Sequence, residues 1–256
     1  MLCCTLSGVG LIHNSFIAEW QRRFTAWPFA ENTAMLVLPL LWLFLTRRDV
    51  ADYGLSRAGF KDQVDAAVIC GIPFGALVFL NMVNWGEFAG VAQMAAGIAV
   101  LFMFGFLLRN QPTPRMTGAA PCLILAFGHH GIGHAATGVI YYMVLLGPGE
   151  EVLFRGVIQS RLNLAFGRPY RFFGARWGWG AIIASLLFAL AHVANPYALF
   201  AGQWHPVWWA GPTAFCFALP FAFLRERTGG VLAPAVLHAW PQAIGFAVRA
   251  LSYPLA

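Results

Sequence analysis

Long apolar segments are the feature that most constrains how this chain can fold. The clearest lie at residues 32–46, 65–83 and 89–108, at or near the roughly 20 residues that a membrane-spanning helix needs. The 256-residue chain is 59% hydrophobic and only 10% charged, whereas a soluble domain carries about 25% charged residues. The sequence therefore predicts an integral membrane protein built from helices.

Positively charged residues indicate how the predicted helices cross the membrane, because cytoplasmic loops carry an excess of arginine and lysine. Four clusters stand out: Arg47, Arg48, Arg57 and Lys61; Arg109 and Arg115; Arg161, Arg168, Arg171 and Arg176; and Arg225 and Arg227. If all four are cytoplasmic, the chain crosses the membrane an even number of times between the second and third clusters. We therefore expect two spans there, at about 117–132 and 135–160.

Three further spans are expected at about 177–195, 207–224 and 231–250, for a total of about eight. No internal repeat or low-complexity linker divides the chain. We therefore predict that residues 1–256 form one integral membrane domain, an all-α polytopic helical bundle with an intramembrane polar cavity. Residues 1–18 fit either a surface helix or a marginal span.

The remaining composition indicates which partners and which cellular location to expect. The net charge of +6 is accounted for by membrane orientation, so the expected partner is the lipid bilayer and no nucleic acid. Lys61 is the one lysine among sixteen basic residues, which favours a bacterial source and hence the inner membrane. The five cysteines are scattered without metal-ligand spacing and are expected to be packing residues.

Two adjacent glutamates and an arginine interrupt one of the predicted spans. In the segment GPGEEVLFRG, Glu151 and Arg155 are four residues apart and so face one another on a helix, with the glutamate on the favourable N-terminal side. Glu150 points about 100° away from Glu151. Pro148 lacks a backbone donor and is expected to loosen or kink the helix. Ionisable groups at membrane depth are costly and usually functional, so this set predicts a site.

Two histidines on other predicted spans are expected at a similar depth. His192 ends the segment FALAH, and Gln242 follows His238 by four residues on the same helical face. At about 1.5 Å per residue, Glu150 lies roughly 16 Å from the cytoplasmic end of its helix, His192 roughly 22 Å and His238 roughly 12 Å. All three then fall near the middle of a hydrocarbon core about 30 Å thick. A carboxylate and two imidazoles at one depth predict a shared catalytic cavity.

The order of these motifs resembles the CPBP family of intramembrane proteases, which includes the type II CAAX prenyl endopeptidases. The similar segments are EEVLFRGVIQSRL, SLLFALAHVANP and ERTGGVLAPAVLHAW, and the resemblance covers about residues 140–250. It implies an endopeptidase that hydrolyses membrane-associated or peptide substrates without a cofactor. By the resemblance, Glu150 activates the attacking water with help from His192, and His238 stabilises the oxyanion.

The remaining site residues support this chemistry or depart from the family pattern. Glu151 is expected to orient the site and Arg155 to supply its counter-charge. Gln242 stands where the family usually has asparagine, and Pro241 directly before it disturbs the local helix. A glutamine has the same amide donor on a longer stem, so Gln242 either reaches the oxyanion or has no catalytic part.

Two other functions fit the same residues. Two histidines and a glutamate are a known catalytic zinc set, so a zinc protease could use Glu150, His192 and His238 as ligands. However, zinc chemistry would still need a separate base, and no His-Glu-x-x-His motif is present. The other alternative is a non-catalytic scaffold or a transport-like protein. Transporters usually show matched halves with paired broken helices, and the 147–156 pattern has no second copy.

Overall fold

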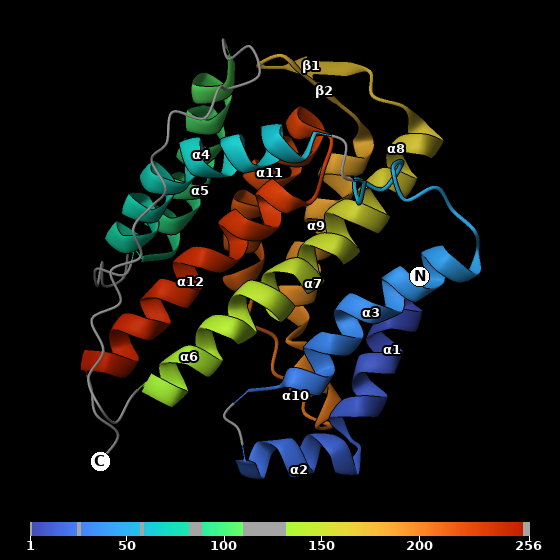
Figure 1. Cartoon of the computed structure of the whole chain (residues 1–256), viewed down its shortest axis with the longest axis vertical. Helices are drawn as coiled ribbons and strands as arrows, with labels where there is room; N and C mark the ends of the chain where they lie inside the picture. Colours follow the sequence, from blue (N-terminus) through green and yellow to red (C-terminus); the bar gives the residue numbers. More distant parts are fainter. Residues whose placement is uncertain (1, 25–26, 57–58, 82–88, 110–131, 253–256) are drawn as a thin grey trace.

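A computed structural model of the protein describes residues 2–24, 27–56, 59–81, 89–109 and 132–252, and over these ranges the chain is mostly helical. Figure 1 shows the helices packed side by side, with a β-hairpin at one end of the molecule and helix α2 at the other. The hairpin, of strands β1 (Tyr170–Phe172) and β2 (Ala175–Trp177), is the only sheet in the described part of the chain. The predicted all-α class is consistent with this architecture.

The N-terminal part forms the two flanks of the molecule. Its helices are α1 (Leu2–His13), α2 (Phe16–Phe24), α3 (Phe29–Leu45), α4 (Phe60–Asn81) and α5 (Ala89–Arg109). Helices α1 and α3 pack together on one flank, and α4 and α5 lie together on the opposite flank. The first 18 residues are thus divided between two helices and form no continuous span.

A single long helical rod runs through the middle of the molecule. Its successive segments are α6 (Ile132–Ile140), η2 (Tyr141–Leu146), α7 (Gly147–Glu151), η3 (Val152–Gln159) and α8 (Ser160–Phe166), of which η2 and η3 are π-helical. Pro148 has no backbone N–H to give the carbonyl four residues earlier, and the N–H of Gly147 bonds the carbonyl of Tyr142, five residues back. The expected loosening at Pro148 therefore takes the form of widened turns on both sides of the short α7. Such turns are frequent at functional sites.

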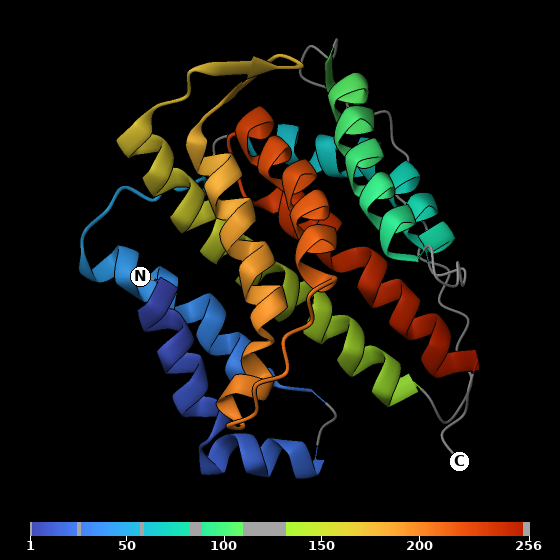
Figure 2. The ribbon, with the colours of Figure 1, turned by 180° about the vertical axis from the view of Figure 1, so that it is seen from behind.

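Three helices of the C-terminal part complete the bundle, with the short α10 (Pro196–Phe200) between the first two. They are α9 (Trp179–Ala194), α11 (Ala210–Thr228) and α12 (Leu232–Ser252). Helix α11 packs against both α9 and α5, and its position beside α9 is clear in the rear view (Figure 2). Small side chains permit this close packing, since Ala214, Ala218 and Ala222 are buried in α11.

A glycine sets the distance between α12 and the central rod. A Cβ atom at Gly147 would lie 2.6 Å from the Cβ of Ala239 and 2.9 Å from the carbonyl oxygen of Ala235. Real Cβ atoms do not approach other atoms so closely, because packed interiors are already filled. Gly147 therefore lets α12 come near enough to α7 for their polar side chains to meet.

By length and apolar composition, one described helix is sufficient to cross a membrane: the stretch of α5 from Gly90 to Arg109. Helices α1, α3 and α9 are apolar but shorter. The predicted bundle of eight spans is therefore not confirmed, and the span expected at 117–132 lies outside the described residues. The other predicted spans coincide with helices.

The outward faces of several helices carry large apolar side chains. Phe102 and Phe106 on α5 are 52% and 73% exposed, and Phe44, Leu45, Leu186 and Leu190 are exposed on α3 and α9. Soluble monomers rarely expose large contiguous apolar patches. These faces are suited to contact with lipid.

Basic residues of α5, α8, the hairpin and α11 gather at one end of the molecule, where these three helices have their C-terminal ends (Figure 1). Two contacts hold this end together: Arg225 Nη2 donates to the carbonyl of Asp52, and Arg227 Nη2 donates to the carbonyl of Leu108. The prediction from charge omitted Arg22 and Arg23, which belong to α2 at the opposite end. Positive charge is therefore not confined to the hairpin end.

Candidate active site

Two adjacent carboxylates on α7 meet one imidazole from α12. The Nδ1 of His238 lies 2.8 Å from Oε1 of Glu151, within hydrogen-bond distance. Its other nitrogen, Nε2, lies 3.5 Å from Oε2 of Glu150. His238 therefore stands between the two glutamates, with one ring nitrogen directed to each.

This arrangement differs from the expected separation of the two glutamates. Consecutive residues of a helix diverge by about 100°, so we expected Glu150 to face a task of its own, away from Glu151. A ring placed between the diverging side chains can contact both, because its two nitrogens lie on different sides. The close approach of α12 over Gly147 puts His238 in that position.

The arginine of the motif is completely enclosed. Its Nη1 lies 3.2 Å from Oε1 of Glu151, and both side chains have no exposed surface. Its Nη2 donates to the carbonyl of Ala218 at 3.1 Å, and its guanidinium carbon lies 4.7 Å from the centre of the Phe188 ring. A carboxylate, a carbonyl and an aromatic face together compensate for burying the charge of Arg155.

Aromatic rings fix the orientation of both histidines. Phe221 stacks on His238 at 5.1 Å between ring centres with an interplanar angle of 14°. Phe188 contacts His192 at 4.3 Å and His238 at 6.0 Å, ring centre to ring centre. Phe188 therefore lies between the two histidines and beneath Arg155. The segment FALAH contains Phe188, but nothing in the sequence indicates the role of Phe221.

His192 is held by a hydrogen bond to its own helix. Its Nδ1 lies 2.9 Å from the carbonyl oxygen of Phe188, and a carbonyl oxygen can only accept. Nδ1 must therefore carry the proton, which leaves Nε2 of a neutral His192 as an acceptor. No contact joins His192 to Glu150 among the described residues.

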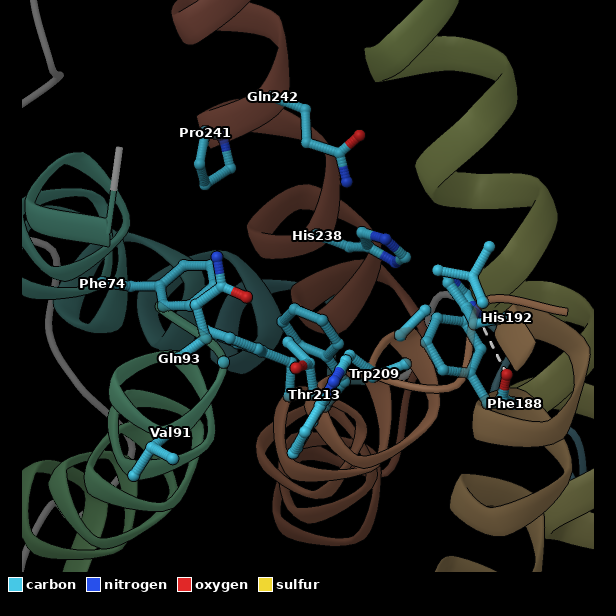
Figure 3. Close-up of a pocket in the computed structure, with 16 residues that line it drawn as sticks. Phe74, Val91, Gln93, Phe188, His192, Trp209, Thr213, His238, Pro241 and Gln242 are labelled. Atoms are coloured by element: carbon cyan, nitrogen blue, oxygen red, sulfur yellow. Dashed lines mark hydrogen bonds between the residues drawn. The ribbon is translucent and has the colours of Figure 1, made fainter. Parts of the chain in front are cut away.

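A cavity of about 800 Å³ opens beside these groups. Its wall includes His192 from α9, His238 and Gln242 from α12, and Gln93 from α5, within a largely apolar lining (Figure 3). The amide of Gln242 points towards the His238 ring. Glu150 does not line the cavity, so His238 is the residue that connects the two carboxylates with it.

Several acceptors and donors in the site are left without hydrogen bonds. Oε2 of Glu150 and Oε2 of Glu151 are buried and have no hydrogen-bond partner within the described part of the chain. Buried polar groups are nearly always satisfied, so each exception asks for an explanation. A carboxylate that keeps an unengaged oxygen can accept a proton from a reactant.

A zinc protease would use Glu150, His192 and His238 as ligands. Among the described residues, no group of three or more histidine, cysteine, aspartate or glutamate side chains is placed to hold a metal ion. Both ring nitrogens of His238 already contact the two glutamates, which differs from ligands converging at about 2.0–2.2 Å on one ion.

A second buried carboxylate, on α11, lies against a later part of the same rod. Glu226 of α11 accepts hydrogen bonds from Nε2 of Gln159 at 2.6 Å and Nδ2 of Asn163 at 2.5 Å through Oε1. Its Oε2 accepts from Nε of Arg168 at 2.6 Å. The oxygen of the Asn163 amide accepts from the backbone N–H of Gly180. This cluster joins η3, α8, α9 and α11, and we found no sign of it in the sequence.

Comparison with known proteins identifies one family that the chain is similar to. Residues 132–244 match the family described as type II CAAX prenyl endopeptidase Rce1-like. No curated protein and no solved structure matches the chain. The matched range runs from α6 into α12 and contains all six predicted site residues: Glu150, Glu151, Arg155, His192, His238 and Gln242.

The Rce1-like family is a family of membrane-integral proteases. The single described helix that can cross a membrane, α5, lies outside the matched range. Residues 132–244 of this chain are therefore similar to the Rce1-like type II CAAX prenyl endopeptidases, whose family model they match.

Proposed function

We propose that the protein is an intramembrane endopeptidase in which Glu150 activates water to hydrolyse a peptide bond. The observation that carries the proposal is the contact of His238 with both Glu150 and Glu151 at the wall of the cavity. A scaffold needs no imidazole between two buried carboxylates and no cavity beside it. The family match makes protease activity the expected use of such a site.

The charges of the site balance if His238 is protonated on both nitrogens. Glu150 and Glu151 carry two negative charges, and Arg155 and a cationic His238 carry two positive ones. Since isolated charges are costly in a poorly solvated interior, this balance favours the doubly protonated ring. His238 then donates to Glu151 through Nδ1 and has a second donor at Nε2.

In the proposed reaction, Glu150 takes a proton from a water while the oxygen of that water attacks the peptide carbonyl carbon. The neutral His192, with Nε2 as an acceptor, orients the same water. Glu150 then gives the proton to the departing nitrogen as the carbon–nitrogen bond breaks, which leaves a carboxylic acid and an amine. Each proton and atom is thereby accounted for without a cofactor.

The oxyanion formed in the first step needs donors. His238 lines the cavity, and its Nε2–H is the first candidate. The amide of Gln242, which points towards His238 (Figure 3), is the second. Glu151 and Arg155 act on the reaction through His238, because Glu151 holds Nδ1 and Arg155 fixes Glu151.

The setting of the reaction is part of the proposal. We propose an eight-span bundle in a bacterial inner membrane with the hairpin end in the cytoplasm, and a substrate that is a membrane-associated peptide or protein. Exposed apolar faces on α3, α5 and α9 support membrane contact.

A trapping experiment tests the proposal. The Glu150→Gln variant keeps the shape of the side chain and removes its basicity, so it should bind substrates without cleaving them. Membranes containing the wild type or the variant are compared by mass spectrometry for proteins that accumulate with the variant and appear as fragments with the wild type. Digestion in H₂¹⁸O should place one heavy oxygen in the new carboxyl terminus. Equal fragment levels from both proteins would remove Glu150 as the base.

The alternatives give different results in the same assay. A zinc protease would lose cleavage after treatment with a strong chelator and recover it with added zinc, whereas the proposed mechanism is indifferent to both. A scaffold would yield no fragment that depends on Glu150, although partners could still be captured. Chelator-resistant, Glu150-dependent cleavage is the expected outcome.

A further inference from the structure

The β-hairpin at the end of the bundle presents two arginines directly opposite one another. Arg171 of β1 and Arg176 of β2 are cross-strand partners in the register of the hairpin, and both are exposed. Cross-strand neighbours lie about 4.5–5.5 Å apart at Cβ, and like charges there destabilise the pair. The sequence places a repulsive pair at a position where almost any residue would be tolerated.

No carboxylate relieves this repulsion. Neither arginine has a hydrogen-bond or ion-pair partner among the described residues, and the nearby Glu226 is occupied by Gln159, Asn163 and Arg168. The undescribed range 110–131 contains no acidic residue at all. The pair is therefore available to bind an external anion.

The hairpin holds the two arginines in a fixed place. Its turn has positive φ at both central residues, 46° at Phe173 and 80° at Gly174, and a bulky residue in that region is strained. Packing maintains it: a Cβ atom added at Gly105 of α5 would lie 2.3 Å from Cδ2 of Phe173. The neighbouring Phe172 contacts Phe102 at 5.8 Å between ring centres. The hairpin is thus fastened to the C-terminal half of α5.

Apolar surface lies on the elements that adjoin the hairpin. Phe102 and Phe106 of α5 are 52% and 73% exposed. Tyr170 and Trp179, which contact each other edge to face at the base of the hairpin, are 46% and 44% exposed. Tyrosine and tryptophan are enriched where a membrane meets water, and α5 is the described helix that can cross one. The ligand that fits is an anion attached to an apolar body.

We propose that Arg171 and Arg176 form a binding site for the phosphate of an anionic phospholipid, whose acyl chains lie along the exposed face of α5. Arginine suits this task because its planar guanidinium donates two hydrogen bonds to one phosphate. The site is separate from the peptidase chemistry and is independent of the proposed reaction. An acidic protein segment or a free anion would satisfy the charge but would leave the phenylalanines without a function.

The test measures lipid retention and needs no enzyme assay. The full chain is purified in detergent with equal amounts of phosphatidylglycerol and phosphatidylcholine that have the same acyl chains, and the lipids that remain bound are counted by native mass spectrometry. The wild type should retain phosphatidylglycerol preferentially. Arg171→Gln with Arg176→Gln should lower that preference by about fivefold for each arginine, since each basic side chain near the surface is worth about 1 kcal/mol.

The matched control removes two exposed positive charges outside the hairpin. Arg48 and Arg161 are both exposed and have no partner within the described residues, so Arg48→Gln with Arg161→Gln should keep the preference. A loss of equal size in both double variants would mean diffuse surface charge and would overturn the site. An unchanged preference in the hairpin variant would overturn it as well.

Two further measurements exclude trivial explanations. Arg176→Glu replaces the repulsive pair with an attractive one, so it should raise thermal stability in phosphatidylcholine while abolishing the preference for phosphatidylglycerol. A preference that survives this substitution contradicts the proposal. A soluble polyglutamate peptide should bind the wild type and the hairpin variant equally weakly. If it binds the wild type tightly and the hairpin variant does not, the partner is an acidic protein segment and the lipid proposal is wrong.

Discussion

Two buried carboxylate clusters lie between the central rod and its neighbouring helices, and they are built differently. In the Glu226 cluster, both carboxylate oxygens accept hydrogen bonds, from Gln159 and Asn163 on one side and Arg168 on the other. In the Glu150 cluster, formed by Glu150, Glu151, Arg155 and His238, one oxygen of each glutamate has no hydrogen bond among the described residues. The carboxylate of Glu226 is saturated, whereas those of Glu150 and Glu151 are not.

The difference separates a structural role from a chemical one. A fully satisfied buried network rigidifies a protein, whereas a partly satisfied one is costly and persists only for a reason. The Glu226 cluster fastens four elements at the hairpin end, and neither oxygen of its carboxylate is left for a ligand. The Glu150 cluster retains basic oxygens beside a cavity of about 800 Å³. Substitutions in the two clusters should therefore affect different observables.

The largest expected contrast is between the same substitution in each cluster. Glu150→Gln should lower the cleavage rate by about 10²–10⁴-fold, the usual contribution of a positioned base, with little change in thermal stability. Glu226→Gln should weaken hydrogen bonds to a charged acceptor and lower the free energy of unfolding by about 1–3 kcal/mol. Its cleavage rate per folded molecule should stay near that of the wild type.

Cleavage and thermal unfolding are measured on the same detergent-purified samples. The comparison would collapse if Glu226→Gln lost activity as severely as Glu150→Gln while remaining folded. It would also collapse if Glu150→Gln were as unstable as Glu226→Gln, because the unsatisfied oxygens would then be structural.

Arg155 tests the connection between stability and chemistry inside the Glu150 cluster. Arg155→Met should cost about 3–5 kcal/mol of stability, because it leaves the carboxylate of Glu151 buried without its counter-charge. It should also lower cleavage, since Glu151 would no longer hold His238 in place. Thermal unfolding and cleavage are followed together.

A double variant distinguishes lost charge from lost packing. Adding Glu151→Gln to Arg155→Met removes the unpaired charge, so part of the stability should return while cleavage stays low. If Arg155→Met alone folds and cleaves like the wild type, the ion pair has no part in the site.

The sequence predicted those parts of the molecule that depend on local spacing. Apolar length located helices close to α4, α5 and α12, and the four-residue spacing of Glu151 and Arg155 predicted their ion pair. Mostly helical structure is confirmed, but the eight spans are not. The catalytic roles of the six site residues stay predictions.

Contacts between elements could not be predicted in the same way. Which face of α12 turns towards α7 depends on packing over Gly147, and spacing along one helix does not contain that information. Spacing likewise did not indicate that the ring of His238 lies between the two glutamates. The hairpin was also missed, because the segment YRFFGARW is too short to show a strand period and lies inside a basic stretch.

Two glycines of α7 offer a smaller test of the geometry. Gly147→Ala places a Cβ atom against Ala235 and Ala239 and should cost about 1–3 kcal/mol through overpacking. Because it shifts α12, and with it His238, we expect cleavage to fall by up to about 10²-fold. Gly149→Ala is the matched control, since its nearest contact would be an ordinary 3.5 Å to the carbonyl oxygen of Asn32. Gly149→Ala should leave both stability and cleavage unchanged. Equal losses of cleavage in both variants would mean that activity does not depend on the close approach of α12 to α7.

The smallest effect is expected at Gln242. It lines the cavity at four residues from His238, but no hydrogen bond to its side chain is present among the described residues. A donor stabilises the oxyanion effectively only if it is held in place, and a well-held donor raises the turnover rate by about 10²–10³-fold. Gln242→Leu should therefore lower the turnover rate by less than about 10-fold, without changing thermal stability. Gln242→Asn, with the same amide on a shorter stem, should recover some of that loss if the amide acts as a donor. A loss of 10²-fold or more in the leucine variant would show that substrate binding orders Gln242, and would place it beside His238 in stabilising the oxyanion.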